Sequence, residues 1–229
     1  MNWSNNVALF NEDCLKGFSK YPDNHFDIAI VDPPYGIDFQ SARRTEKDKW
    51  HKKIANDKEP FTKWLKPLFP KMKEGARLFI FYRWDVMDIF IKEARQAGFK
   101  PVWDMVWDKV IHGMGDLKAA PGARHEPFMY FTKGRYEFKG NRPVTVYKTP
   151  RVNAEKMIHP NEKPVLLYQA LLRDFASKGE KMIDPFLGSA ASCDAAIKEG
   201  LQFDGYEIDK DYFNKASDRI NKGVQSSLF

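Results

Sequence analysis

Short apolar runs alternate with segments of helical periodicity along this chain, and this alternation constrains its fold more than any other feature. We expect strands at residues 26–31, 77–82, 101–107, 127–132, 181–184 and 202–208. We expect helices at residues 14–21, 61–72, 86–97, 164–177, 190–199 and 211–221. Strands alternating with helices predict an α/β fold, a mostly parallel sheet covered by helices on both faces. The 101–107 and 127–132 strands are expected to add one antiparallel hairpin.

The 26–31 strand runs directly into the tetrapeptide Asp32-Pro33-Pro34-Tyr35. In open α/β sheets, ligands bind where parallel strands end. Because proline has no backbone N–H, the loop offers two acceptors, the Asp32 carboxylate and the Pro33 carbonyl, beside the Tyr35 ring. Acceptors next to an aromatic face suit the exocyclic amine of a nucleobase. A Pro-Pro turn with a packed tyrosine is the alternative that this peptide alone leaves open.

A second informative stretch, residues 181–192, combines a short apolar strand, a glycine turn and a helix start. About twenty residues later, Glu207 is expected to end the next strand. An acidic residue at that place can accept hydrogen bonds from ribose hydroxyls, as in dinucleotide-binding folds. An ordinary strand–turn–helix connection is the alternative interpretation.

Two shorter segments carry weaker signals. The H-P-N-E-K-P segment at 159–164 begins a predicted helix, with Pro164 in its first turn. Lys163 in that segment is either a ligand-binding residue or a solvated first-turn lysine. The N-E-D-C-L segment at 11–15 precedes Asp32 by about twenty residues. Asp13 in it is equally suited to cap the 14–21 helix.

Together these four segments resemble the motifs of the amino-directed DNA methyltransferases, and the resemblance covers residues 11–219. With the tetrapeptide first and the glycine turn last, their order resembles the circularly permuted β class. The resemblance implies a Rossmann-like methyltransferase fold and S-adenosyl-L-methionine (AdoMet) as cofactor. The implied catalytic residues are Asp32, Pro33, Pro34 and Tyr35. The implied cofactor-binding residues are Asp13, Cys14, Asp32, Lys163, Asp184, Phe186, Gly188, Ser189, Glu207 and Ile208.

Two residues depart from the family's cofactor motif, D-P-F-x-G-S-G-T. Ala190 stands at its second glycine and Ser192 at its threonine. Both residues are small, and alanine is tolerated where a helix approaches a strand in related glycine-rich loops. The departures predict at most a weaker cofactor affinity.

Length and composition agree with these expectations. A chain of 229 residues fits a single catalytic domain over residues 1–229. Its two cysteines, Cys14 and Cys193, exclude a disulfide framework and suit the cytoplasm. The five histidines show no metal-ligand spacing, so we expect no metal. The sequence has neither an apolar run of about eighteen residues nor a signal-peptide pattern, so no membrane contact is expected.

Positive charge gathers in two segments that we expect to be DNA-binding insertions, at about 41–58 and 109–158. Residues 109–158 carry ten basic and four acidic side chains, an excess equal to the net charge of +6 of the whole chain. Such clustering is typical of phosphate-binding surfaces, although solvated charged loops are the alternative. The candidate DNA-binding residues are Arg43, Arg44, Lys47, Lys118, Arg124, Arg135 and Arg142.

The predicted function is site-specific methylation of double-stranded DNA at adenine N6. Asp32 favours adenine, because family members that methylate cytosine N4 more often carry serine at this position. Cytosine-N4 methylation, RNA amino-methylation and a non-catalytic nucleic-acid-binding module are the alternatives. We find no nuclease segment, so a restriction partner would be a separate chain. The sequence leaves open whether the chain forms a homodimer.

Overall fold

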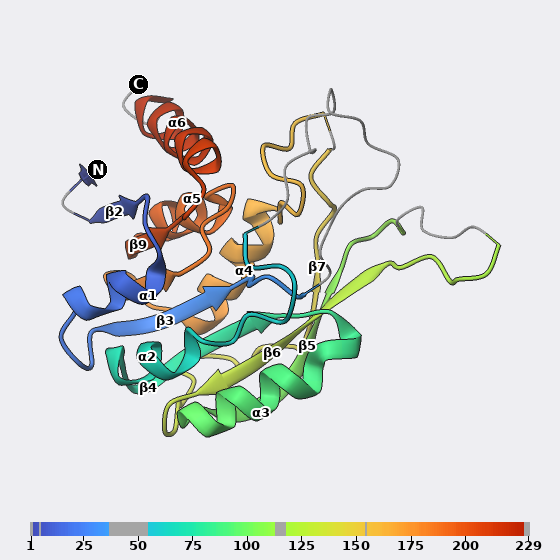
Figure 1. Ribbon diagram of the computed structural model, residues 1–229, viewed down its shortest axis with the longest axis horizontal. Coiled ribbons are helices and arrows are strands. Elements are labelled where there is room, and N and C mark those ends of the chain that lie inside the picture. The colour runs from blue at the N-terminus through green and yellow to red at the C-terminus, as the bar shows by residue number, and fades with distance from the viewer. Residues whose placement is uncertain (1, 5, 37–54, 113–117, 154, 227–229) are drawn as a thin grey trace.

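The computed structural model describes residues 2–4, 6–36, 55–112, 118–153 and 155–226, whose strands form one mixed sheet (Figure 1). The strand order across the sheet is β1-β2-β9-β8-β3-β4-β6-β5-β7. Strands β2, β9, β8, β3 and β4 run parallel, whereas β6 is antiparallel to both β4 and β5. The strand bounds are β1 (Asn2–Ser4), β2 (Val7–Phe10), β3 (Phe26–Val31), β4 (Met72–Phe81), β5 (Lys100–Asp108), β6 (His125–Thr132), β7 (Val146–Lys148), β8 (Lys181–Asp184) and β9 (Gln202–Tyr206).

Helices cover both faces of this sheet. The helix bounds are α1 (Cys14–Gly17), α2 (Leu65–Leu68), α3 (Met87–Ala97), α4 (Val165–Phe175), α5 (Ala191–Lys198) and α6 (Lys210–Ser226), with 3-10 turns η1 (Phe18–Lys20), η2 (Phe69–Lys71) and η3 (Trp84–Val86). One apolar cluster packs α4, α5 and α6 on one face, and a second packs α1, α2 and α3 on the other. The central strands are therefore buried on both sides, which explains why they read as continuous apolar runs.

The expected α/β architecture is confirmed, including the hairpin. Strands β5 and β6 pair antiparallel, with Met105 opposite Phe128 and Trp107 opposite Glu126. Figure 1 shows the described parts of the connection between these strands, residues 109–112 and 118–124, projecting away from the body of the molecule. Strands β3 and β8 have the bounds expected from the sequence.

Several expected elements have different bounds. The 61–72 helix is wrong: α2 and η2 cover only part of it, and Met72 already begins β4. Pro67 and Pro70 lack the N–H groups that a continuous helix needs. The 14–21 helix shortens to α1 followed by η1, and the 202–208 strand ends at Tyr206. The sequence did not predict β1, β2 or β7, each of at most four residues.

The parallel strands β2, β3, β8 and β9 end along one side of the sheet, here called the carboxyl edge. Asp32 follows β3 there and Glu207 follows β9, while Asp184 is the last residue of β8. The opposite side, where these strands begin, is the amino edge. The fold thus brings three acidic residues from distant parts of the chain to one edge.

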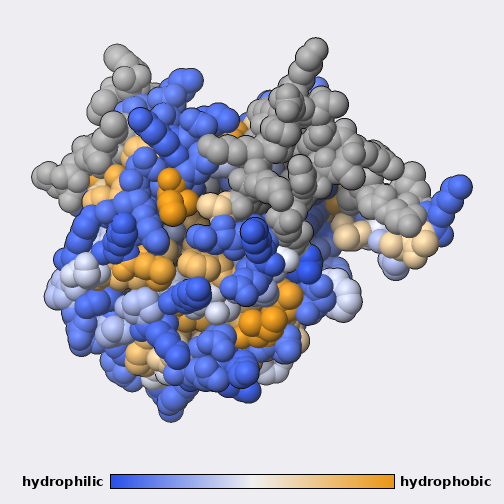
Figure 2. Space-filling model, in the orientation of Figure 1, coloured by the Kyte–Doolittle hydropathy of each residue, from blue (hydrophilic) through white to orange (hydrophobic). Residues whose placement is uncertain are grey.

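The face of the molecule seen in Figure 2 is mostly polar where its residues are described. Figure 2 shows a largely hydrophilic face on which apolar side chains gather in small, separate patches. Among the described residues, no helix combines the length and the apolar character needed to cross a membrane.

Candidate active site at the carboxyl edge

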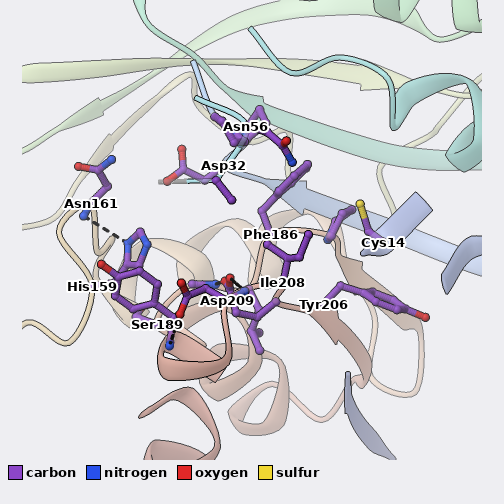
Figure 3. A pocket seen from close by; sticks show the side chains of 18 of the residues that line it. Cys14, Asp32, Asn56, His159, Asn161, Phe186, Ser189, Tyr206, Ile208 and Asp209 are labelled. Atoms are coloured by element: carbon purple, nitrogen blue, oxygen red, sulfur yellow. Dashed lines mark hydrogen bonds between the residues drawn. The ribbon is translucent and has the colours of Figure 1, made fainter. Parts of the chain in front are cut away.

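A cleft opens at the carboxyl edge, lined by segments far apart in the sequence (Figure 3). Its empty space is about 1070 Å³ with its open mouth included, enough for a nucleotide-sized ligand. Among the residues predicted to be catalytic or cofactor-binding, only Asp184 is not among the described residues that line the cleft. The predicted residues that line the cleft are Asp13, Cys14, Asp32, Pro33, Pro34, Tyr35, Lys163, Phe186, Gly188, Ser189, Glu207 and Ile208.

Asp32 belongs to a row of alternating charges. The Tyr35 hydroxyl donates to one of its carboxylate oxygens, and the Lys163 ammonium donates to the other. The Lys163 nitrogen also lies 2.9 Å from a Glu126 oxygen, and the second Glu126 oxygen lies 2.9 Å from the Lys109 nitrogen. We call Asp32, Lys163, Glu126 and Lys109 the buried charge chain. The Lys163 side chain is only 3% exposed, so it is not the solvated lysine considered from sequence.

The pKa directions follow from this arrangement. Burial raises the pKa of Asp32, and the Lys163 ammonium opposes that rise. Burial alone would raise the pKa of Glu126, but Lys163 and Lys109 outweigh it and lower that pKa to about 2. Burial would lower the pKa of Lys163, but its two carboxylate partners outweigh it and raise that pKa. Lys163 and Glu126 therefore stay charged at neutral pH.

The tetrapeptide loop is anchored on residues 55–61. The Pro34 carbonyl accepts the Phe61 N–H at 3.0 Å, and the Gly36 N–H donates to the Asp57 carboxylate at 2.9 Å. Gly36 has a φ of 78° and lies so close to Pro60 that a Cβ would be 2.6 Å from its Cδ atom, so glycine is required there. Figure 3 shows Asn56 of the same segment beside Asp32.

Glu207 lies at the other end of the cleft. One carboxylate oxygen accepts the Gly188 N–H and the other accepts the Asp209 N–H, each at 2.9 Å. Burial raises the pKa of Glu207 to about 7, although both N–H groups oppose the rise. Phe186 and Ile208 flank this end (Figure 3). A carboxylate between apolar side chains suits a nucleoside, whose ribose donates hydrogen bonds and whose base is flat and apolar.

Asp184 and Asp13 shape the loops of the cleft. Asp184 is 3% exposed, and it accepts the Ser192 hydroxyl at 2.5 Å and the Phe186 N–H at 3.0 Å. It therefore holds the glycine turn in place from beneath the cleft. Asp13 accepts the Leu15 N–H at 2.9 Å, which confirms it as the cap of α1, and it also lines the cleft.

Ala190 adopts the backbone conformation for which glycine is the usual choice. Its φ is 59° and its ψ is 25°, in the left-handed region, and it directly precedes α5. Left-handed geometry costs a non-glycine residue roughly 1–2 kcal/mol. The departure from the family motif is thus accommodated at an energetic cost, with the turn preserved.

The predicted DNA-binding residues lie in different places. Lys118 and Arg124 are exposed in the β5–β6 connection, which leaves the sheet on the carboxyl-edge side. Arg124 is held by both oxygens of Asp108, at 2.8 and 2.9 Å. Arg135 follows β6 beside Gly75 of β4, at the amino edge, so the structure separates it from the cleft. Arg142 is exposed, and Arg43, Arg44 and Lys47 lie outside the described residues.

Sequence reasoning missed Glu126. It stands second in β6, directly opposite Trp107, and the rest of that strand is mainly apolar. A single acidic residue at the start of such a strand was the available signal. Its contact with Lys163 becomes visible only in the structure, where the antiparallel pairing of β6 places the start of that strand at the carboxyl edge.

Comparison with known proteins assigns the chain to a family. The sequence model of a DNA methylase family, named for N6 and N4 methyltransferases, matches residues 26–218. YubD of Escherichia coli (strain K12), assigned as a methylase, is 29% identical over 212 residues, or 91% of this chain and 87% of that protein. The type II methyltransferase M.HpaI of Haemophilus parainfluenzae is 22% identical over 241 residues, or 93% of this chain and 74% of its own length.

Solved methyltransferases share the fold. The complex of M1.HpyAVI with SAM superposes with a TM-score of 0.74 at 18% identity, covering 94% of this chain and 99% of the other. The cytosine-N4-specific PvuII DNA methyltransferase superposes with a TM-score of 0.75 at 13% identity, covering 97% and 91%. This chain belongs to the DNA amino-methyltransferase family.

Proposed function

We propose that this chain transfers a methyl group from AdoMet to the exocyclic N6 amine of adenine within a specific sequence of double-stranded DNA. The observation that carries the proposal is the Asp32 carboxylate. It follows a buried strand, lines the cleft, and is held by Tyr35 and Lys163 while its side chain stays 20% exposed. A carboxylate fixed in this way can still accept a hydrogen bond from a substrate.

The chemistry follows from the acceptors at this place. The N6 lone pair of adenine is delocalised into the ring, so the free amine is a poor nucleophile. Hydrogen bonds from the amine to Asp32 and to the Pro33 carbonyl localise that lone pair. As the new N–C bond forms, positive charge grows on the nitrogen, and the fixed Asp32 carboxylate stabilises it. The surplus proton then passes to Asp32 or to water.

Residues at the far end of the cleft would hold the cofactor. Glu207 would accept the ribose hydroxyls, and Phe186 and Ile208 would flank the adenine of AdoMet. Bound AdoMet supplies a methyl group on a positively charged sulfur, and the bonding pair stays with the sulfur on transfer. The protein's contribution is to hold the amine in line with that methyl group.

The target base must leave the duplex to reach Asp32, because an exocyclic amine inside a base pair cannot react. The Tyr35 ring lines the cleft beside the carboxylate and would stack on the flipped base. Lys118 and Arg124 leave the sheet on the same side and would contact phosphates.

Cytosine N4 is the second candidate. It is also an exocyclic amine, and it makes the same demands on Asp32. The fold shared with the cytosine-N4-specific PvuII methyltransferase favours this alternative. The aspartate at position 32 favours adenine.

Nucleoside analysis separates the candidates. The purified chain is incubated with labelled AdoMet and unmethylated bacterial DNA, and the digested nucleosides are resolved by mass spectrometry. We expect labelled N6-methyladenine, and none with the Asp32→Ala variant. Labelled N4-methylcytosine would replace the proposal with its alternative. A parallel reaction with bacterial RNA tests the substrate class, and label in RNA alone would overturn both.

A further inference from the structure

The buried charge chain extends beyond the cleft. Asp32 and Lys163 line the cleft, whereas Glu126 is absent from its described lining and reaches it only through Lys163. The Lys163 nitrogen is shared by both carboxylates and lies 4.5 Å from the centre of the Phe81 ring. Because both carboxylates accept from one ammonium, their oxygens are within roughly 5–6 Å of each other.

This sharing poses an electrostatic question. Asp32 must present negative charge to the amine, yet a buried lysine bound to it alone would cancel that charge. A second carboxylate on the same ammonium restores the negative charge of the site. Lys109 lies on the far side of Glu126, and its side chain is 17% exposed. With its positive charge included, the net charge of the four groups is zero.

We propose that Glu126 is a positioning residue that shares the Lys163 ammonium with Asp32, so that the site as a whole keeps a negative potential that stabilises the positive charge of the methyl-transfer centre. This inference rests on the proposed function, since it assumes that transfer occurs at Asp32. The centre carries one positive charge throughout, first on the sulfonium of AdoMet and then on the methylated amine. Glu126 therefore favours cationic ligands over neutral ligands of the same shape.

A pair of ligands isolates this effect. AdoMet carries the sulfonium charge, whereas S-adenosyl-L-homocysteine lacks both the methyl group and the charge. The ratio of their dissociation constants, measured by calorimetry without DNA, reports the electrostatic preference of the cleft. A purely structural contribution of Glu126 would weaken both ligands equally and leave this ratio unchanged.

Two substitutions should move the ratio in opposite directions. Glu126→Gln keeps the shape but removes a negative charge, so the preference for AdoMet should fall by about fivefold. Lys109→Gln removes a positive charge and should raise that preference. The double variant should return close to the wild-type ratio.

The rate of methyl transfer to DNA gives a second measurement. Glu126→Gln should slow single-turnover transfer by roughly tenfold or more, and Glu126→Asp should restore part of the rate.

Glu180→Gln is the matched control. Glu180 forms an ion pair with Arg77 and is 17% exposed, close to the 20% of Glu126, but it lies near the amino edge. Its loss should lower the melting temperature and leave the ligand ratio unchanged.

Two outcomes would overturn the proposal. One is an unaltered ratio of dissociation constants in a folded Glu126→Gln variant. The other is a shift of that ratio in the same direction in Glu126→Gln and Lys109→Gln. If Glu126→Gln fails to fold, Lys109→Gln decides by the sign of its shift. This binding test is independent of which base is methylated, so it can fail while the nucleoside analysis succeeds.

Discussion

The two edges of the sheet each hold a buried ion pair, and the two pairs have different surroundings. At the amino edge, Arg77 binds Glu180, donates to the Phe175 carbonyl at 2.7 Å and lies 4.6 Å from the Tyr136 ring centre. At the carboxyl edge, Lys163 binds Asp32 and Glu126 beside an open cleft. The first pair joins elements of the fold, whereas the second lies beside open space in which a ligand could reach the Asp32 carboxylate.

This comparison shows that a buried ion pair does not by itself mark an active site. Charges are costly to bury, and structural networks perturb pKa values as functional sites do. The difference is that Asp32 has room beside it for a substrate, and that its lysine is shared with a second carboxylate. Substitutions at the carboxyl edge should therefore impair methyl transfer, and substitutions at the amino edge should lower the free energy of unfolding.

The largest expected effect is at the carboxyl edge. Asp32→Ala should reduce methyl transfer by about a thousandfold, the upper end of the range seen when a fixed electrostatic partner of the transition state is removed. Circular dichroism should show a folded protein, since Asp32 follows a strand and lies outside the apolar core. Transfer of labelled methyl groups to DNA measures the effect. Turnover close to wild type would break the assignment of function to this edge.

The matching change at the amino edge should affect stability instead. Arg77→Met removes the partner of Glu180, and breaking a buried pair typically costs about 3–5 kcal/mol of unfolding free energy. Urea denaturation measures this loss. At a temperature where the variant is folded, its AdoMet affinity should equal that of wild type. A selective loss of AdoMet binding would mean that the two edges are coupled.

A smaller effect is expected within the cleft at Glu207. Glu207→Ala should weaken AdoMet binding by about 1.5–3 kcal/mol, the range for hydrogen bonds to a charged group. Calorimetric titration gives this value directly. An unchanged dissociation constant would show that another group holds the ribose.

The affinity for AdoMet should also depend on pH. The pKa of Glu207 is raised to about 7, so its carboxylate gains a proton as the pH falls through that value. A protonated Glu207 is a poorer acceptor, and AdoMet binding should weaken roughly tenfold between about pH 8 and pH 6. Glu207→Gln should flatten this profile. A wild-type affinity that is constant over this range would exclude the carboxylate as the titrating acceptor.

The smallest expected effect concerns DNA. Arg124→Ala at the carboxyl-edge hairpin should reduce the log–log salt slope of DNA binding by about 0.9 for one lost phosphate contact. Arg135→Ala is the natural comparison, since Arg135 is 85% exposed and lies at the amino edge. It should change neither the slope nor the sequence preference. Equal effects of both changes would mean that DNA reaches across both edges.

Much of the carboxyl edge could be predicted from the sequence, because its signals are local. A strand buried on both faces reads as an apolar run, so the positions of Asp32 and Asp184 at strand ends followed directly. Glu126 could not be predicted in the same way, since its contact with Lys163 depends on the order of strands in the sheet. Strand β7 has only three residues and pairs with β5, which is far from it in the sequence, so no periodic pattern in the sequence predicted it.

The most direct test of the central claim is the single-turnover rate of methyl transfer as AdoMet is raised to saturation. Glu207→Ala should approach the wild-type rate at saturating AdoMet, because it impairs only cofactor binding. Asp32→Ala should stay slow at every concentration, because it lacks the group that stabilises the reacting amine. Recovery of the Asp32→Ala rate at high AdoMet would contradict the account, since Asp32 would then serve cofactor binding alone.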